Sequence, residues 1–335
     1  MNMKIKTVLV TGGAGYVGAV LVPKMLARGY KVKVLDWYIY GDVFKPYQSN
    51  RNYIQIKGDL RDRSLVKEAL KDTDAVIHLA CISNDPSFEL NPKLGTSINY
   101  DAMKILVDLS KKAGVQRFIF ASSSSVYGVK KEKTVTEDLS LEPLTDYSKY
   151  KILSEQYILD AATGDFIVLV LRPATVCGYS PRMRLDLTVN MLTIQALVNG
   201  RITVFGGSQT RPNIHIEDIT DLYVKTLNYP KRKIAGKIYN AGYENLAVMR
   251  IAKMVKKVLK NRNIDITISP TDDKRSYRIS SEKIKRELGF IPKHSVEEAI
   301  ADIKKAHEHG DLPNPLVDDR YYNIRTMKSL LNLRL

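Results

Sequence analysis

Short apolar runs alternate with stretches of helical periodicity through the first half of the chain, and this alternation constrains the fold most. The apolar runs are 6–12, 31–36, 74–80, 116–123 and 166–173. Helical patterns separate them, near 16–28, 62–71, 98–113 and 146–161. Apolar strands joined by single helices favour right-handed crossovers and a parallel sheet covered on both faces. We therefore predict a doubly wound α/β domain over residues 1–173.

The regular alternation ends near residue 173. The segment 174–211 has no clear period, whereas 234–242 is again an apolar run with a glycine at its end. We therefore expect the chain to return to the sheet over about 212–242. A smaller, mixed domain that binds the substrate is predicted from 174–211 together with 243–335.

Composition narrows the class of protein. The 335 residues are 44% hydrophobic, enough to bury a large core, and no run approaches 18 apolar residues. The N-terminus has no cleavable apolar region, and the two cysteines, Cys81 and Cys177, match no zinc spacing. We expect a cytoplasmic protein without a metal site or a membrane partner.

The formal net charge of +16 favours anionic or phosphorylated partners. Much of the excess lies in amphipathic stretches such as 253–260 and 281–290, where the lysines face away from the apolar positions. Such patterns are typical of solvated helix faces. Because no RNA-recognition, zinc-finger or helix-turn-helix signature accompanies them, a nucleic-acid partner is not expected.

Glycines 12, 15 and 18 follow the first predicted strand directly, in 11-TGGAGYVG-18. Gly12 allows a tight turn, Gly15 lets the backbone approach a pyrophosphate, and Gly18 lets helix and strand pack closely. The helix that follows offers free N–H groups and a positive dipole end. An ordinary glycine-rich turn is the alternative, but the position between strand and helix predicts a dinucleotide site.

Two acidic positions extend this prediction. Asp36 ends the next strand, where its carboxylate can hold both hydroxyls of an adenosine ribose and repel a 2′-phosphate. NAD is therefore favoured over NADP, although Lys31 and Lys33 are nearby. Asp59 and Leu60 stand where an adenine would rest, but that segment is equally an ordinary turn with a helix cap.

A Tyr-x-x-x-Lys pair can place an ammonium beside a phenol on one helix face and lower the pKa of the phenol. The spacing occurs five times, at Tyr53/Lys57, Tyr100/Lys104, Tyr127/Lys131, Tyr147/Lys151 and Tyr229/Lys233. Position selects among them. Only Tyr147 starts a helix downstream of the strand that ends in 122-SSSS-125, at the sheet edge where open α/β sheets bind ligands. A serine there can share a proton with the Tyr147 phenol, although a structural cap is the alternative for each serine.

Motifs along nearly the whole chain resemble the extended short-chain dehydrogenase/reductases that act on nucleotide sugars, such as the UDP-glucose 4-epimerases. They are 11-TGGAGYVG-18, 78-HLA-80, 122-SSSSVYG-128, 147-YSKYK-151, 171-LRPATVCG-178, 211-RPNIHIED-218, 239-YNAG-242 and 285-KRELGF-290. The resemblance implies a Rossmann fold, NAD, and a nucleotide-diphosphate sugar as substrate. It also suggests a homodimer through the helices near 98–113 and 146–161.

The resemblance implies roles for individual residues. Ser123 and Tyr147 match the catalytic hydroxyl and the acid/base, and Lys151 matches the lysine that holds the ribose. Contacts to NAD are implied for Gly12, Gly15, Tyr16, Val17, Asp36, Asp59, Leu60, Leu79, Ala80, Asn99, Tyr147 and Lys151. Contacts to the substrate are expected from Ser83, Ser124, Thr175, Arg182, Arg184, Asn190, Arg211 and Arg275. His215 is expected to be structural.

Three departures from the family pattern limit this transfer. Ser124 and Ser125 stand where the dehydratases carry Asp and Glu, so loss of water from the sugar is not expected. Thr175 and Cys177 replace the usual Asn and aromatic, and 272-DDKRSY-277 replaces an R-x-G-D segment. The loop 180–190 also resembles that of dehydrogenases acting on GDP-linked heptoses, and its arginines suit a diphosphate.

These patterns predict an NAD-dependent nucleotide-sugar epimerase that acts through a 4-keto intermediate. A 4-dehydrogenase or ketoreductase would use the same residues and stays an alternative. A non-catalytic NAD-binding sensor is the rival from another class, but such a protein would normally have lost Tyr147 or Lys151.

Overall fold

The computed structural model describes residues 5–271 and 276–332. Its centre is a sheet of seven strands with the order β10-β6-β5-β4-β1-β2-β3, and every neighbouring pair is parallel. The strands are β1 Thr7–Thr11, β2 Lys31–Asp36, β3 Tyr53–Lys57, β4 Ala75–His78, β5 Arg117–Ala121, β6 Ile167–Pro173 and β10 Lys237–Ala241. This order confirms the predicted Rossmann fold.

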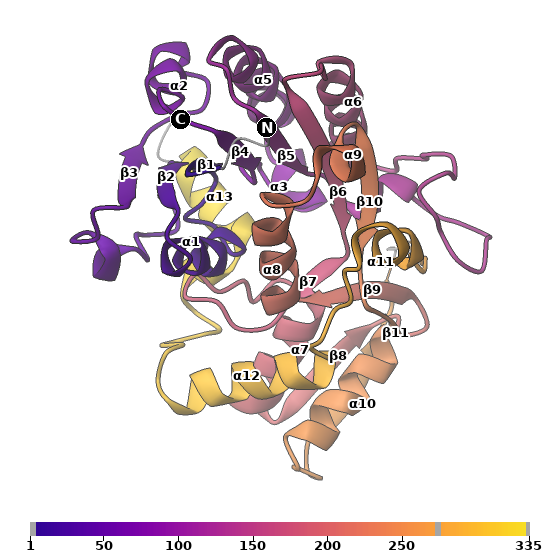
Figure 1. Ribbon diagram of the computed structural model, residues 1–335. Helices are drawn as coiled ribbons and strands as arrows, with labels where there is room; N and C mark the ends of the chain where they lie inside the picture. Colours follow the sequence, from indigo (N-terminus) through magenta and orange to yellow (C-terminus); the bar gives the residue numbers. More distant parts are fainter. Residues whose placement is uncertain (1–4, 272–275, 333–335) are drawn as a thin grey trace.

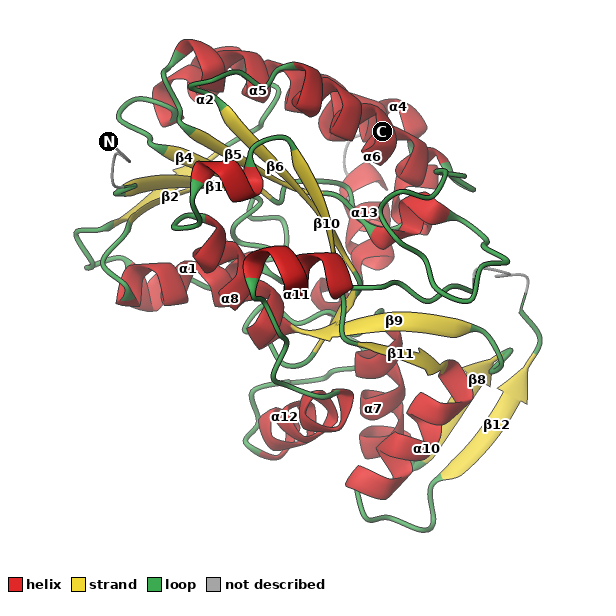
Figure 2. Cartoon of the chain, turned by 45° about the vertical axis from the view of Figure 1, so that its right-hand side comes forward, coloured by secondary structure: helices red, strands yellow, loops and turns green. Residues whose placement is uncertain are grey.

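Helices cover both faces of this sheet (Figures 1 and 2). Val8 and Val10 of β1 join an apolar cluster with α1 (Gly18–Ala27), α8 (Ile216–Thr226) and α11 (Glu282–Leu288). Leu9 between them points to the opposite face and packs with α2 (Arg63–Ala69), α5 (Ala102–Lys112) and α6 (Asp146–Asp160). Successive side chains of one strand thus enter two separate cores, which explains the continuous apolar runs of the sequence.

Short helical elements occupy the connections near the strand ends. They are 3₁₀ turns at Lys45–Tyr47, Ser124–Tyr127 and Asp319–Tyr321, a π-helical turn at Ser97–Asp101, and helices α3 (Asp85–Glu89), α4 (Pro92–Thr96) and α9 (Lys231–Ile234). Asn84, which caps α3, has a φ of 73°. Its side chain accepts a hydrogen bond from the Ser87 amide, and this local bond helps to hold a left-handed conformation that is unusual for a non-glycine residue.

A smaller part of the chain packs below the carboxyl edge of the large sheet (Figure 2). It contains a three-stranded sheet of order β11-β9-β7, in which β9 is antiparallel to β11 and parallel to β7. A parallel pair, β8 and β12, lies beside helices α7 and α10, and α12 packs on these two helices (Figure 2). The bounds are β7 Thr175–Cys177, α7 Thr188–Asn199, β8 Arg201–Phe205, β9 Thr210–His215, β11 Glu244–Ala247, α10 Val248–Val258, β12 Asp265–Ser269 and α12 Val296–Glu308.

The chain crosses between the two parts several times. β9 belongs to the small sheet, and the path to the large sheet runs through α8, which packs on α1, to β10. Two later helices also lie against the first part: α11 contacts β10, and α13 (Asn323–Asn332) contacts α3. In the described ranges, no helix is long and apolar enough to cross a membrane.

Candidate active site

A cavity of about 570 Å³ opens at the carboxyl ends of the parallel strands. Its walls come from the turn after β1, the end of β2, the segments that follow β3, β4 and β5, and the loop before α7. Open α/β sheets bind ligands in this crevice because the loops from neighbouring strands diverge there. The cavity therefore contains both the predicted dinucleotide site and the predicted catalytic residues Ser123 and Tyr147.

Glycines shape the turn after β1. Gly12 has a φ of 70°, and a Cβ there would lie 2.5 Å from the Ala80 backbone. A Cβ on Gly18 would lie 2.1 Å from the Gly13 carbonyl oxygen. Neither position tolerates a side chain, because backbone atoms surround both. Gly12 and Gly15 line the cavity together with Tyr16 and Val17, and the two glycines present bare backbone to a ligand.

Asp36 lies at the next strand end and links two loops. Its carboxylate accepts hydrogen bonds from the Ala14 amide at 3.0 Å and the Tyr38 amide at 2.7 Å. Asp59 and Leu60 also line the cavity, and Asp59 pairs with Arg61 at 2.6 Å. A glycine cradle beside a fixed carboxylate fits the pyrophosphate and ribose of a dinucleotide. Leu79 and Ala80 complete this wall.

Tyr147 and Ser123 meet at the other end of the cavity. Burial raises the pKa of the Tyr147 phenol well above 10, and the charges of Cys81 and Asp85 act in the same direction. Arg184 and a hydrogen bond with Ser123 lower this pKa. Arg184 is the cation that acts against the effect of burial on this phenol.

Hydrogen bonds fix the serine side chains. The Ser123 side chain accepts a hydrogen bond from the Ser125 amide at 3.1 Å and lies 2.9 Å from the Ser125 hydroxyl. Ser148 of α6 donates to Ser125 at 3.0 Å, which joins the serine turn to the helix that carries Tyr147. Ser124 lies 3.3 Å from the Tyr277 hydroxyl.

Lys151 lies beneath the cavity, not in its wall. Its ammonium donates to the Ala121 carbonyl at 2.7 Å and lies 5.8 Å from the centre of the Tyr147 ring. Lys151 is therefore not among the main groups that shift the pKa of the Tyr147 phenol in this geometry. Its charge, together with burial as the larger cause, lowers the pKa of His78 to about 3.

A buried ion pair holds α6 against the strands. Glu155 of α6 receives hydrogen bonds from the Arg172 guanidinium, the shortest at 2.6 Å, and both side chains are at most 4% exposed. Ser122 donates to the same carboxylate. Arg172 also contacts the Tyr127 hydroxyl at 2.8 Å, so this tyrosine of a second Tyr-x-x-x-Lys pair belongs to the core.

Arginines of the 180–190 loop line the cavity but bind protein groups. Arg182 lies 3.6 Å from the centre of the Tyr40 ring, and burial lowers its pKa to about 10. Arg184 pairs with Asp186 at 2.9 Å and donates to Ser83 at 3.4 Å. Thr175 and Arg211 also line the cavity.

Two predicted contact residues, Asn99 and Asn190, lie outside the cavity wall and hold loops that form it. The Asn99 amide bonds to both backbone groups of Ile82, at 2.7 and 3.0 Å. Asn190 bonds to the Gly178 amide, the Tyr16 hydroxyl and the Arg184 carbonyl. Arg275 lies outside the described residues.

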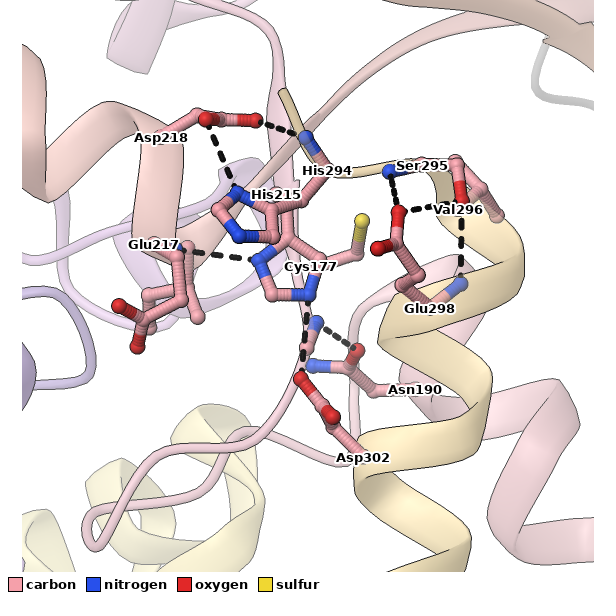
Figure 3. Close-up of polar contacts among 12 residues, drawn as sticks. Cys177, Asn190, His215, Glu217, Asp218, His294, Ser295, Val296, Glu298 and Asp302 are labelled. Carbon is pink, nitrogen blue, oxygen red and sulfur yellow. Dashed lines mark hydrogen bonds and ion pairs between the residues drawn. The ribbon is translucent and has the colours of Figure 1, made fainter. Parts of the chain in front are cut away.

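His215 also lies outside the cavity wall, in a cluster shown in Figure 3. Its Nδ1 accepts a hydrogen bond from the Glu217 amide at the start of α8, and its Nε2 lies 3.3 Å from Asp302. The adjacent His294 contacts Asp218 at 3.1 Å. These contacts agree with the structural role expected for His215, because they join β9 and α8 to the segment around α12.

Sequence reasoning missed several cavity residues. Asp186 could have been found two positions after Arg184, where an acidic partner for a loop arginine is common, and Tyr40 lies close to Asp36. Trp37 and Ile39 also lie close to Asp36, and Cys81 directly follows Ala80. Others carry no local signal, because they come from distant segments: Tyr223, Tyr277, Asn323 and Met327.

The glycine cradle, the paired Ser123 and Tyr147, and the parallel sheet define a dinucleotide-binding enzyme of the α/β class. Residues 8–242 match the model of the NAD dependent epimerase/dehydratase family, and the chain belongs to this family. The UDP-glucose 4-epimerase of Lactobacillus helveticus is 30% identical over 326 residues, which cover 90% of this chain and 97% of that protein.

Solved structures agree with this assignment. MoeE5 in complex with UDP-glucuronic acid and NAD superposes with a TM-score of 0.79 at 27% identity, covering 90% of this chain and 99% of that one. DesIV from Streptomyces venezuelae, a dTDP-glucose 4,6-dehydratase with NAD bound, has a TM-score of 0.83 at 25% identity, covering 92% and 99%.

Proposed function

We propose that the chain is an NAD-dependent nucleotide-sugar epimerase that acts through a 4-keto intermediate. The observation that carries the proposal is one cavity lined both by Tyr147, whose phenol is hydrogen-bonded to Ser123, and by the Gly12 turn and Asp36. The kinship with nucleotide-sugar enzymes supports the substrate class. When bound, NAD⁺ supplies the hydride acceptor.

The side chains would divide the proton chemistry. Tyr147 takes the proton of the sugar C4 hydroxyl as hydride leaves the same carbon, and Ser123 holds that oxygen. Because burial raises the pKa of Tyr147, the positive charge of Arg184 favours the ionised phenol that abstraction needs. Lys151 keeps α6 joined to the end of β5 through the Ala121 carbonyl. Asn99 acts indirectly, by fixing Ile82 in the cavity wall.

Epimerisation requires the keto sugar to rotate and receive hydride on its other face. A 4-dehydrogenase would release the keto sugar instead, with the same residues, and it stays the alternative. The contacts of Ser124 argue against a dehydratase, because its partner is the Tyr277 hydroxyl and not an acid. Glu142 is no substitute acid, since its side chain is 57% exposed and pairs with Lys130.

The substrate would lie across the remaining wall. We propose that Ser83, Ser124 and Thr175 contact the sugar and that Arg211 contacts the diphosphate, whose charge suits a guanidinium. Arg184 would stand at the sugar end, beside Tyr147. We also propose a homodimer through the outer faces of α5 and α6.

The first test is a substrate panel. The purified protein is incubated with UDP-, GDP-, dTDP- and CDP-sugars, and the products are identified by mass and NMR. An epimerase returns a product of unchanged mass, and a dehydrogenase returns one lighter by two hydrogens. A product lighter by one water would contradict the proposal, because it requires an acid and a base at C5 and C6.

The second test removes the proposed acid/base. Tyr147→Phe deletes only the ionisable oxygen, so we expect a loss of turnover of several orders of magnitude with NAD binding retained. Tyr100→Phe is the matched control, because Tyr100 has the same spacing to Lys104 and its ring lies 4.3 Å from that ammonium. Turnover by Tyr147→Phe close to that of Tyr100→Phe would rule out the mechanism.

A further inference from the structure

Helix α13 begins at Asn323, which binds three residues in two loops of the cavity wall. The Asn323 side chain is buried, and its Oδ1 accepts a hydrogen bond from Arg182 at 2.5 Å. Its Nδ2 donates to Ser83 at 2.7 Å, and its backbone amide donates to Asp186 at 3.2 Å. The amide therefore has a single orientation, and α13 is attached to the loops after β4 and before α7.

One turn later, Met327 provides an apolar anchor. It is 2% exposed and packs with Ile82 and Ile98, while Trp37 and Ile39 pack against the same cluster. All five side chains line the cavity. Trp37 directly follows Asp36, and the Arg61 partner of Asp59 lies 5.6 Å from the Trp37 ring. Met327 thus stands beside the adenosine end of the dinucleotide site.

The family model ends at residue 242, so α13 lies beyond the segment that defines the family. Figure 1 shows α13, in yellow, next to α3, although the two helices are far apart in the sequence. The described segment from α12 to the end of α13 contains no strand, so a movement of α13 need not break any strand pairing.

We propose that α13 is a clasp over the adenosine half of the NAD site, in which Asn323 and Met327 are positioning residues that slow the release of NAD. Opening the clasp breaks the three hydrogen bonds of Asn323 and exposes the apolar cluster around Met327 to water. Both effects raise the free-energy barrier to NAD dissociation, so the clasp lowers the rate at which NAD leaves.

This clasp bears on the reaction. An epimerase returns its hydride to the same sugar and needs no exchange of NAD, whereas a dehydrogenase must exchange it in each cycle. Slow release favours the epimerase, a consequence that rests on the proposed function. The clasp itself rests only on NAD binding.

The experiment measures NAD release without any sugar. Protein loaded with NAD is mixed with excess etheno-NAD, and the fluorescence change gives the dissociation rate. We expect Asn323→Ala and Met327→Ala to release NAD at least tenfold faster than wild type. Met327→Leu keeps an apolar side chain of similar volume and should stay within about threefold of wild type. Lys328→Ala, on an exposed position of the same helix, is the control and should not change the rate.

The unfolding midpoint of each variant without NAD separates the clasp from general stability. A clasp predicts fast release even in a variant whose midpoint matches that of Lys328→Ala. Release at the wild-type rate in both alanine variants would overturn the proposal. So would equally fast release in Met327→Leu and Met327→Ala. If the rates behave as expected but no nucleotide sugar is converted, the proposed function fails and the clasp stands.

Discussion

Replacing Glu155 should lower the free energy of unfolding far more than replacing a carboxylate of a surface ion pair. The change Glu155→Ala leaves the Arg172 guanidinium, whose side chain is 3% exposed, without its carboxylate. Among the described residues, the Tyr127 hydroxyl at 2.8 Å is then its main partner. Leaving one member of a buried ion pair uncompensated costs about 3–5 kcal/mol. This is a large share of the roughly 5–15 kcal/mol by which most folded domains are stable.

Urea denaturation, followed by circular dichroism, measures this free energy of unfolding. Glu297→Ala is the matched control, because Glu297 pairs with Lys257 at 3.0 Å but both side chains are at least 42% exposed. Such a pair contributes about 0–1 kcal/mol. The reasoning is refuted if Glu155→Ala loses no more stability than Glu297→Ala. A loss of the expected size would also identify the contact that holds the Tyr147 helix against β6.

Two further predictions concern the cofactor and pH. Asp36→Ala should weaken NAD binding and reduce the protein's preference for NAD over NADP, because the carboxylate repels a 2′-phosphate. Titration of both dinucleotides measures this preference. Tighter binding of NADP than of NAD by the wild type would contradict the prediction. Burial lowers the pKa of His78 from 6.5 to about 3, so the folded state resists protonation and loses stability as the pH falls below 6.5. The loss should reach about 2 kcal/mol between pH 7 and pH 5, and it should be absent in His78→Gln, which keeps a partner for Thr11. Equal pH slopes in the two proteins would show that His78 is not the group responsible.

The dinucleotide half of the site could be read from the sequence because its determinants are local. A side chain at Gly12 or Gly18 would collide with backbone atoms of the same turn or of the neighbouring strand end. Asp36 follows at the end of the adjacent strand. Periodicity and glycine spacing report such geometry directly. The same reasoning selected Tyr147 among five equal spacings, and the structure places it in the first turn of α6 and in the cavity wall. Its role as acid/base stays a prediction.

The other half could not be read in this way. Arg182 was expected to meet a diphosphate, and that contact stays a prediction. Its contacts within the protein, with the Tyr40 ring and Asn323, span long sequence separations that no local pattern reports. Lys151 was expected to lower the phenol pKa, but its ammonium is directed to the Ala121 carbonyl, and a residue from a distant loop, Arg184, has the larger effect. Spacing along one helix does not report where a flexible lysine side chain will find its acceptor.

The cofactor and the sugar depend on different kinds of protein group. Sites of this class bind a dinucleotide largely through backbone groups and one carboxylate, so a chain can change most of its side chains and still bind NAD. The cavity is also lined by side chains from four separate segments, around Ser83, Ser124, Arg184 and Tyr277, which we propose as the sugar end. Identity near 30% with a UDP-glucose 4-epimerase therefore carries the cofactor over more securely than the sugar. The nucleotide and the sugar must come from the substrate panel, because Ser124 and Tyr277 stand in segments where this chain departs from the family pattern.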